Sequence, residues 1–187
     1  MKEKLKIARD SLEVLQQDEI FLKQVDEALK ALTKSLADNK KILIAGNGGS
    51  ATQASHMAGE LVGRFAFDRP ALPAISLFDL ATTTAIGNDY GYEDIFSRFV
   101  DGLGGENDIL FSISTSGNSV NCLKAMESAK KKKIKNIVLL GKDGGKMKGS
   151  ADIAIIIPEN STPLIQEIHL MVIHWLCEEV EKYFFKE

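Results

Sequence analysis

The sequence predicts an α/β protein: a three-layer α/β/α sandwich around a five-stranded parallel sheet, preceded by an N-terminal helix or helices. Two observations predict this class. After residue 40, five short apolar runs alternate with helix-like stretches, and continuously apolar runs are typical of parallel strands covered on both faces. In addition, 187 residues suit one domain, and no linker or repeat divides them. The runs are KILIAG at 41–46, PAISL at 73–77, DILFSI at 108–113, NIVLLG at 136–141 and ADIAIIIP at 151–158.

The first forty residues have apolar side chains at mostly helical intervals, which leaves open one long helix or a helical hairpin. These apolar positions exceed what covering a small sheet needs. We therefore expect residues 1–40 to pack on a single domain of residues 1–187 and to lie in an oligomer interface. A last helix is expected from about Pro163 to Phe184, because Ser-Thr-Pro is a start signal. The periodic residues of the first segment are Leu12, Leu15, Ile20, Phe21, Val25, Ala28, Leu29, Leu32 and Leu36.

Composition argues against several classes of function. A formal net charge of −3 disfavours nonspecific binding to nucleic acid. The basic run from Lys130 to Lys133 is interpreted as a solvated helix end, where lysines oppose the partial negative charge. The charged N-terminus lacks the apolar core of a signal peptide, and no run approaches the ~20 apolar residues of a membrane span. We expect a cytoplasmic protein without a membrane or nucleic-acid partner.

The two cysteines, Cys122 and Cys177, lie in helix-like segments without a CxxC spacing. This pattern disfavours a disulfide framework or a structural zinc knuckle. Both are expected to be reduced thiols in the core.

Small polar residues gather where the expected strands end. GNGGSA follows the first strand, STSGNS the third and GKDGGK the fourth, and ligands of parallel sheets bind beyond the carboxyl ends of the strands. The stretch ISTSGNSVN, residues 113–121, has four hydroxyl side chains at a strand-to-helix turn. Hydroxyls there either cap the free N–H groups of the helix or join them around an anion such as phosphate. Spacing alone leaves both interpretations open.

The GNGGSA turn, residues 46–51, also satisfies the GxGxxA pattern of a dinucleotide site. The match is weak, because Asp79 lies farther on than the usual ~20 residues for the acid that binds the ribose. A dinucleotide site also leaves the second hydroxyl-rich turn unexplained, whereas a sugar phosphate between two strand ends uses both. We therefore expect no nucleotide cofactor.

Five stretches together resemble the sugar-isomerase (SIS) fold, which is flavodoxin-like, and more closely the phosphoheptose isomerases. They are GNGGSATQASHMAGELVGR, GNDYGYEDIFSR, SISTSGNSVN, GKDGGKM and IQEIH. The resemblance implies an aldose–ketose isomerase that converts sedoheptulose 7-phosphate to D-glycero-D-manno-heptose 7-phosphate for a surface polysaccharide such as lipopolysaccharide. It also implies a homotetramer with active sites near subunit boundaries.

The resemblance further implies roles for individual residues. Glu60 matches the catalytic base and His174 its acid partner. In some members zinc is held by residues that correspond to His56, Glu60, Gln166 and His174. One departure is Pro163, where some relatives carry an aspartate. The positions that match substrate-binding residues are Asn47, Gly48, Gly49, Ser50, Glu60, Arg64, Asn88, Asp89, Ser114, Thr115, Ser116, Ser119 and Gln166.

Helical geometry supports part of this assignment. His56 and Glu60 are four residues apart and share one helix face. On the last helix, Gln166 is rotated by about 80° from His174. Glu167 lies closer to the face of His174, so geometry does not select Gln166 over Glu167, and Gln166 rests on the resemblance. His169 points away from His174 and is interpreted as a packed or interfacial histidine.

The chemistry is compatible with these residues but leaves alternatives. A carboxylate and an imidazole suffice to move a proton between C1 and C2 through an enediol. However, a glutamate that binds zinc loses basicity, so Glu60 cannot be a tight ligand and a free base at once. The alternatives are a noncatalytic SIS protein that binds a replication-initiator-type partner, and an isomerase of another sugar phosphate. The presence of both Glu60 and His174 favours the enzyme.

Overall fold

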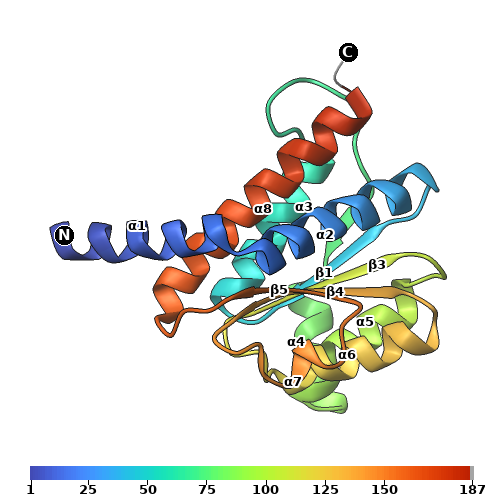
Figure 1. Cartoon of the computed structure of the whole chain (residues 1–187). Coiled ribbons are helices and arrows are strands. Elements are labelled where there is room, and N and C mark those ends of the chain that lie inside the picture. Colours follow the sequence, from blue (N-terminus) through green and yellow to red (C-terminus); the bar gives the residue numbers. More distant parts are fainter. Residues whose placement is uncertain (186–187) are drawn as a thin grey trace.

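The computed structural model describes residues 1–185, which form one five-stranded parallel sheet covered by helices on both faces (Figure 1). Each strand coincides with one of the five apolar runs, so the predicted α/β class and the parallel sheet are confirmed. The strand order is β2-β1-β3-β4-β5, and every neighbouring pair is parallel. The strands are β1 (Ile42–Gly46), β2 (Ala74–Ser76), β3 (Ile109–Ser114), β4 (Lys135–Gly141) and β5 (Ile153–Ile157).

The helices form the two outer layers. One core cluster joins α2, α3 and α8 to one sheet face, and a second joins α5 and α6 to the other. Among residues 1–185, no helix combines the length and the apolar character that crossing a membrane requires. The helical elements are α1 (Lys2–Gln17), α2 (Glu19–Ala37), α3 (Gly49–Val62), α4 (Leu80–Asp89), the 3-10 helix η1 (Tyr92–Asp94), α5 (Ile95–Leu103), α6 (Val120–Lys131), α7 (Gly145–Lys148) and α8 (Thr162–Phe185).

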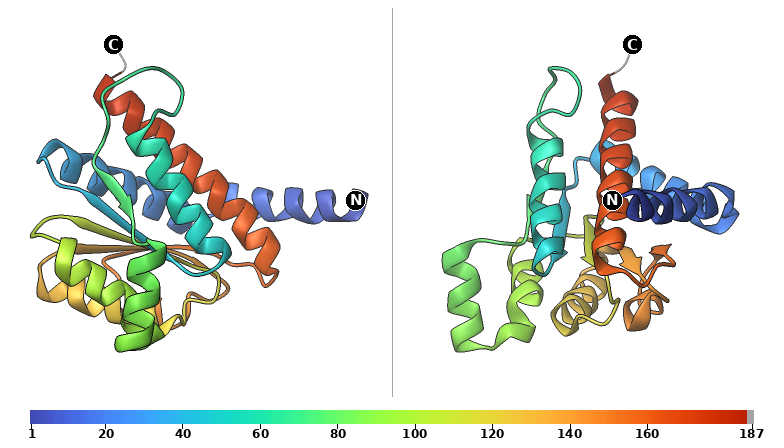
Figure 2. Two further views of the ribbon diagram at one scale, coloured as in Figure 1. Left: turned by 180° about the vertical axis from the view of Figure 1, so that it is seen from behind. Right: turned by 90° about the vertical axis from the view of Figure 1, so that its left-hand side faces the viewer.

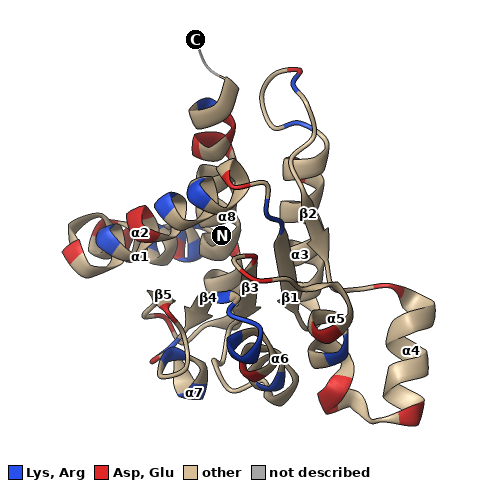
Figure 3. Cartoon of the chain, turned by 90° about the vertical axis from the view of Figure 1, so that its right-hand side faces the viewer, with Lys and Arg blue, Asp and Glu red and all other residues tan. Residues whose placement is uncertain are grey.

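The sheet is apolar because both of its faces are covered. Every residue of β1 and β3 is buried, and Ile42 and Ile44 face one core cluster while Leu43 and Ala45 face the other. Charged residues gather on the helices and loops (Figure 3). The described strands carry one charged residue, Lys135, at the start of β4.

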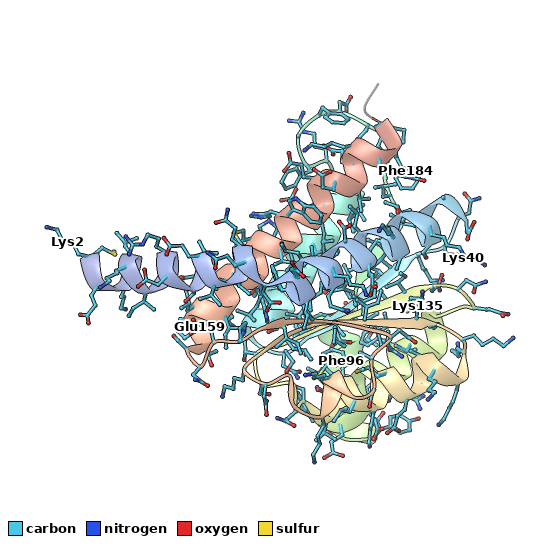
Figure 4. The ribbon with its side chains drawn as sticks, in the orientation of Figure 1. Lys2, Lys40, Phe96, Lys135, Glu159 and Phe184 are labelled. Carbon is cyan, nitrogen blue, oxygen red and sulfur yellow. The ribbon has the colours of Figure 1, made fainter. Side chains whose placement is uncertain are left out.

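The N-terminal segment consists of two helices joined end to end, so the hairpin alternative is wrong (Figure 2). Asp18 separates them: its backbone is extended, and its carboxylate accepts hydrogen bonds from the amides of Ile20 (2.9 Å) and Phe21 (3.0 Å). α2 packs on α8, whereas α1 projects beyond the sheet, where Ser11 contacts Glu159 in the loop before α8 (Figure 4). The apolar side chains along α1 therefore remain largely exposed within one chain.

Both cysteines are free thiols in the core, as the sequence predicted. Cys122 lies in α6 and Cys177 in α8, and both are buried. Burial raises the pKa of each thiol to about 12. Neither cysteine is therefore a reactive thiolate near neutral pH.

The sheet order brings the two polar turns together. β1 and β3 are adjacent and in register, with Gly46 opposite Ile113, so the turns that follow them lie next to each other. β2 and β4 lie on opposite outer sides of this pair. The turns therefore lie where the strand order reverses, which is the place where open α/β sheets bind ligands.

Candidate functional site

In the hydroxyl-rich turn after β3, the serine side chains lie close together and are joined by hydrogen bonds. The Ser114 and Ser119 hydroxyls share a hydrogen bond of 3.1 Å. The Gly117 amide donates to Ser114 Oγ (3.1 Å) and the Asn118 amide to Ser116 Oγ (3.2 Å). Gly117 has φ +63°, and a Cβ there would collide with the Gly144 backbone in the turn after β4. This close packing requires glycine and holds the serines at the end of the strand.

The start of α6 favours an anion over simple capping. Ser119 occupies the N-cap position, yet its side chain makes no capping hydrogen bond to the helix. Its hydroxyl faces Ser114 instead. Because the Ser119 side chain does not cap the helix, the N-terminus of α6 and the serine hydroxyls together suit a phosphate.

A pair of asparagines connects the two turns. The Asn47 side chain, after β1, exchanges two hydrogen bonds of 2.8 Å with the Asn121 side chain on α6. The Tyr92 hydroxyl donates a third hydrogen bond to Asn47 Oδ1 (2.7 Å). Asn47 was predicted to bind substrate, whereas Asn121 and Tyr92 were missed because their sequence spacing carries no signal of this contact. In this arrangement the Asn47 side chain links the turns.

Three predicted catalytic or metal residues meet between α3 and α8. His56 Nε2 lies 2.9 Å from Glu60 Oε1, as their spacing on one helix predicted. His174 Nε2 lies 3.2 Å from His56 Nε2, although 118 residues separate the two histidines. The Phe65 ring lies beside His174, with the two ring centroids 5.8 Å apart. His56 is exposed, and Glu60 and His174 are half-buried, so the cluster is open to a ligand.

The cluster fits a metal ion in its donor set. The ligand atoms of His56, Glu60 and His174 all lie within 4.8 Å of one another. His56 Nε2 faces both partners, and one nitrogen, with a single proton or lone pair, cannot satisfy both by ordinary hydrogen bonds. Two imidazole nitrogens and a carboxylate oxygen around one point are a common donor set for a divalent cation such as Zn²⁺.

Gln166, on α8, lies apart from this cluster, and its side chain is next to the first residue of α3, Gly49. Its side-chain amide lies against Gly49, where a Cβ would collide with it. Its backbone carbonyl accepts a hydrogen bond from Gln53 Nε2 (2.7 Å). The eight residues from Gln166 to His174 correspond to about 12 Å along α8. The structure thus shows Gln166 beside the first polar turn, while Glu167 is exposed.

The other predicted substrate-binding residues are distributed around the two turns and beyond. Ser50 is buried in the first turn of α3. Arg64 is exposed, just after α3 ends. Asn88 donates a hydrogen bond to Asp89 (2.9 Å) at the end of α4, which packs on α5 and η1 to one side of the sheet (Figure 3). Gly48 and Thr115 occupy the two turns themselves.

The structure shows the surroundings of two further residues, Asp79 and His169. Asp79 caps α4, because its carboxylate accepts hydrogen bonds from the Thr82 amide (2.8 Å) and hydroxyl (2.6 Å), which lower its pKa. Asp79 therefore has the role of a helix cap. His169 is fully buried, which confirms its interpretation as a packed histidine.

The sheet order, the serine turn and the histidine–glutamate cluster define a SIS-type α/β protein, and residues 6–141 match the family model described as SIS domain. The phosphoheptose isomerase of Sulfurimonas denitrificans is 45% identical over 186 residues, covering 99% of this chain and 95% of that protein. That of Helicobacter pylori is 52% identical over 168 residues, covering 87% and 88%. The chain belongs to the phosphoheptose isomerase family.

Solved structures agree with this assignment. The phosphoheptose isomerases of Neisseria gonorrhoeae and Francisella tularensis superpose with TM-scores of 0.87 and 0.92. Each is 35% identical and covers 97% of this chain, which in turn covers 98% and 96% of the two solved chains. The similarity therefore extends over nearly the whole fold.

Proposed function

We propose that this chain is a phosphoheptose isomerase that converts D-sedoheptulose 7-phosphate to D-glycero-D-manno-heptose 7-phosphate. This reaction would be the first step toward ADP- or GDP-heptose precursors of lipopolysaccharide or another surface polysaccharide. The observation that carries the proposal is the meeting of Glu60 and His174 at His56, in a chain that is 45% identical to a phosphoheptose isomerase over nearly its whole length.

Proton transfer is assigned to Glu60 and His174. The Glu60 carboxylate removes the proton from one carbon of the C1–C2 pair and returns it to the other, and the His174 imidazole serves the sugar oxygens. Both side chains project from helices rather than from loops, which holds them in place. A carboxylate and an imidazole within one cluster provide the base and the acid that an enediol route requires.

Phosphate binding is assigned to the serine turn and the N-terminus of α6. The hydroxyls of Ser114, Thr115, Ser116 and Ser119 and the free N–H groups of α6 would surround the phosphate. The start of α3 lies at the neighbouring turn, and His56 lies seven residues farther, about 10 Å along the helix. An extended seven-carbon sugar phosphate is long enough to reach from the one to the other.

Zinc is the metal we propose for the cluster. His56, Glu60 and His174 would hold it, and Gln166 could join only by turning its side chain from Gly49 toward His174. A bound zinc ion would supply polarisation of the sugar oxygens. When Glu60 binds the metal its basicity falls, so its two roles require it to change partners during the reaction.

We also propose a homotetramer in which residues 1–40 pack on the single SIS domain and contribute to the interface. An apolar surface between α2 and α8 supports this proposal together with the projecting α1; it consists of the exposed Leu22, Met171 and Trp175 and the half-buried Phe21. Light scattering at working concentration tests the homotetramer, and a monomer at that concentration would refute it.

The expected cytoplasmic location stays a prediction.

Conversion of sedoheptulose 7-phosphate, followed by NMR as aldose formation, tests the activity. A noncatalytic SIS protein that binds a replication-initiator-type partner would show no conversion. An isomerase of another sugar phosphate would show no conversion of this substrate but would act on a shorter or longer one. Solvent deuterium in the product would support the enediol proton transfer.

A further inference from the structure

The loop that follows α3 is attached to α8 by one buried carboxylate. Glu181 Oε2 accepts a hydrogen bond from the Phe65 amide (2.8 Å), and Oε1 accepts one from the Ala66 amide (2.7 Å). Oε2 also accepts one from Arg69 Nε (2.9 Å). The Glu181 and Arg69 side chains are each only 1% exposed. This ion pair is therefore part of the interior, unlike the surface pairs elsewhere on α8.

Arg69 completes the end of the helix that carries Glu60. The last carbonyls of a helix have no intrahelical amide to bind, and α3 ends at Val62. Arg69 Nη2 donates to the Glu60 carbonyl (2.7 Å) and Nη1 to the Leu61 carbonyl (2.7 Å). The guanidinium thus donates to both carbonyls in place of helix amides, and the Leu72 amide donates a second hydrogen bond to the Leu61 carbonyl (3.1 Å).

The chemical reason for this pair lies in the position of Glu60. Glu60 is in the last turn of α3, and terminal turns fray unless their polar groups are satisfied. Glu181 neutralises the buried guanidinium and aims its planar fork at the two carbonyls. Burial raises the pKa of Glu181, but the Phe65 and Ala66 amides and Arg69 outweigh this effect, and the net direction is downward. The carboxylate therefore stays charged near neutral pH.

We propose that Arg69 and Glu181 form a positioning clamp that holds the last turn of α3, and with it Glu60, in its place facing His174. The clamp rests on the proposed isomerase function for its catalytic consequence, although its structural part does not depend on that function. Neither residue touches the cluster by its side chain, so both act through Glu60. The clamp also fixes the start of the segment that carries Phe65, whose ring lies beside that of His174.

The variant Arg69→Lys tests whether the clamp needs the planar N–H groups of the guanidinium or only its positive charge. Lysine keeps a positive charge beside Glu181 but cannot reach both carbonyls in the planar geometry. Because a misplacement of about 1 Å at a reacting group costs up to about 100-fold in rate, we expect kcat to fall by about 10- to 100-fold while KM changes less than about threefold. A kcat equal to that of the wild type in folded Arg69→Lys would overturn the proposal.

Two variants on α8, the helix that carries Glu181, serve as controls. Lys182→Gln removes two surface ion pairs, with Glu178 and Glu179, next to Glu181 and should leave kcat unchanged. Val180→Ala removes buried apolar contacts and lowers the melting temperature, while Arg69 and Glu181 both stay in place. If Val180→Ala reduced kcat as much as Arg69→Lys at a similar melting temperature, general destabilisation would explain the loss and the clamp would be refuted.

Amide hydrogen exchange of the wild type tests the clamp without using activity. We expect the amides of residues 58–62 to exchange as slowly as those of residues 53–57, because the helix end is held. Fast exchange at 58–62 would overturn the proposal even if Arg69→Lys failed to fold. In Arg69→Lys or Glu181→Gln, faster exchange confined to residues 58–70 is expected. A wild type without turnover would refute the proposed function, and exchange would still decide whether the clamp holds the helix.

Discussion

Two histidines on α8 lie five residues apart and have opposite surroundings. His169 is fully buried against the core, whereas His174 is half-buried and meets His56 at 3.2 Å. Five residues rotate a helix by about 140°, which places them on different faces. One face of α8 therefore belongs to the core and another to the candidate site.

The contrast shows that the position on the helix decides what an imidazole can do. Burial lowers the pKa of His169 to about 4, partly opposed by the backbone of Leu140, so His169 stays neutral at physiological pH. A neutral, enclosed imidazole cannot deliver protons to a ligand. His174 lies in an open cluster with a carboxylate, which are the surroundings that its proposed role as an acid requires.

The largest expected effect is a loss of turnover when the residues of the candidate site, on the side of His174, are changed. Glu60→Gln keeps the shape of the side chain but removes the basic carboxylate, so turnover should fall by about 10²- to 10⁴-fold while binding of the phosphate survives. His174→Gln should be similarly severe. Activity is measured by NMR on folded protein, with Glu167→Gln, an exposed neighbour on α8, as the unaffected control.

Metal content separates two explanations of that loss. Loss of zinc and activity together in Glu60→Gln, with zinc-free wild type equally inactive, would favour the ligand role of Glu60 over the role of a proton shuttle. Near-normal turnover of Glu60→Gln would show that Glu60 is not the base.

An intermediate effect is expected at the serine turn, which tests whether the site extends beyond α3 and α8. Ser116→Ala combined with Ser119→Ala removes two hydroxyls, and each charge-assisted hydrogen bond contributes about 1.5–3 kcal/mol. Calorimetry should show weaker binding of the sugar phosphate. Unchanged affinity of the folded double mutant would contradict the phosphate assignment.

The smallest expected effect is on the pH dependence of stability, and it comes from His169 on the face of α8 that packs against the core. The folded pKa of His169 is about 4 and its ordinary value is 6.5, so the unfolded chain binds the proton first as pH falls. The stability that neutral His169 contributes is complete above pH 6.5 and is lost as pH falls from 6.5 toward 4, by up to about 3 kcal/mol. His169→Leu should remove this part of the pH dependence in denaturant unfolding. An unchanged pH dependence would show that His169 is not held neutral.

Most of the fold could be predicted from sequence because its signals are local. Continuous apolar runs mark strands that are buried on both faces, and polar turns at their ends mark one edge of a parallel sheet. The pairing of His56 with Glu60 is equally local, since it follows from a four-residue spacing on one helix. The assignment of Glu60 and His174 to catalysis came from resemblance rather than from such a pattern.

Contacts between distant elements were decided only by the tertiary structure. Periodicity shows that α8 has an apolar side, but it does not show which of its turns packs beside which turn of α3. The approach of His174 to His56, the link between Asn47 and Asn121, and the Arg69–Glu181 pair all depend on that packing. Likewise, periodicity allowed a helical hairpin, and the extended backbone of Asp18 with α2 docked on α8 decided otherwise. The sequence by itself thus determined the elements and their polar ends, whereas side-chain packing between helices determined which polar groups meet.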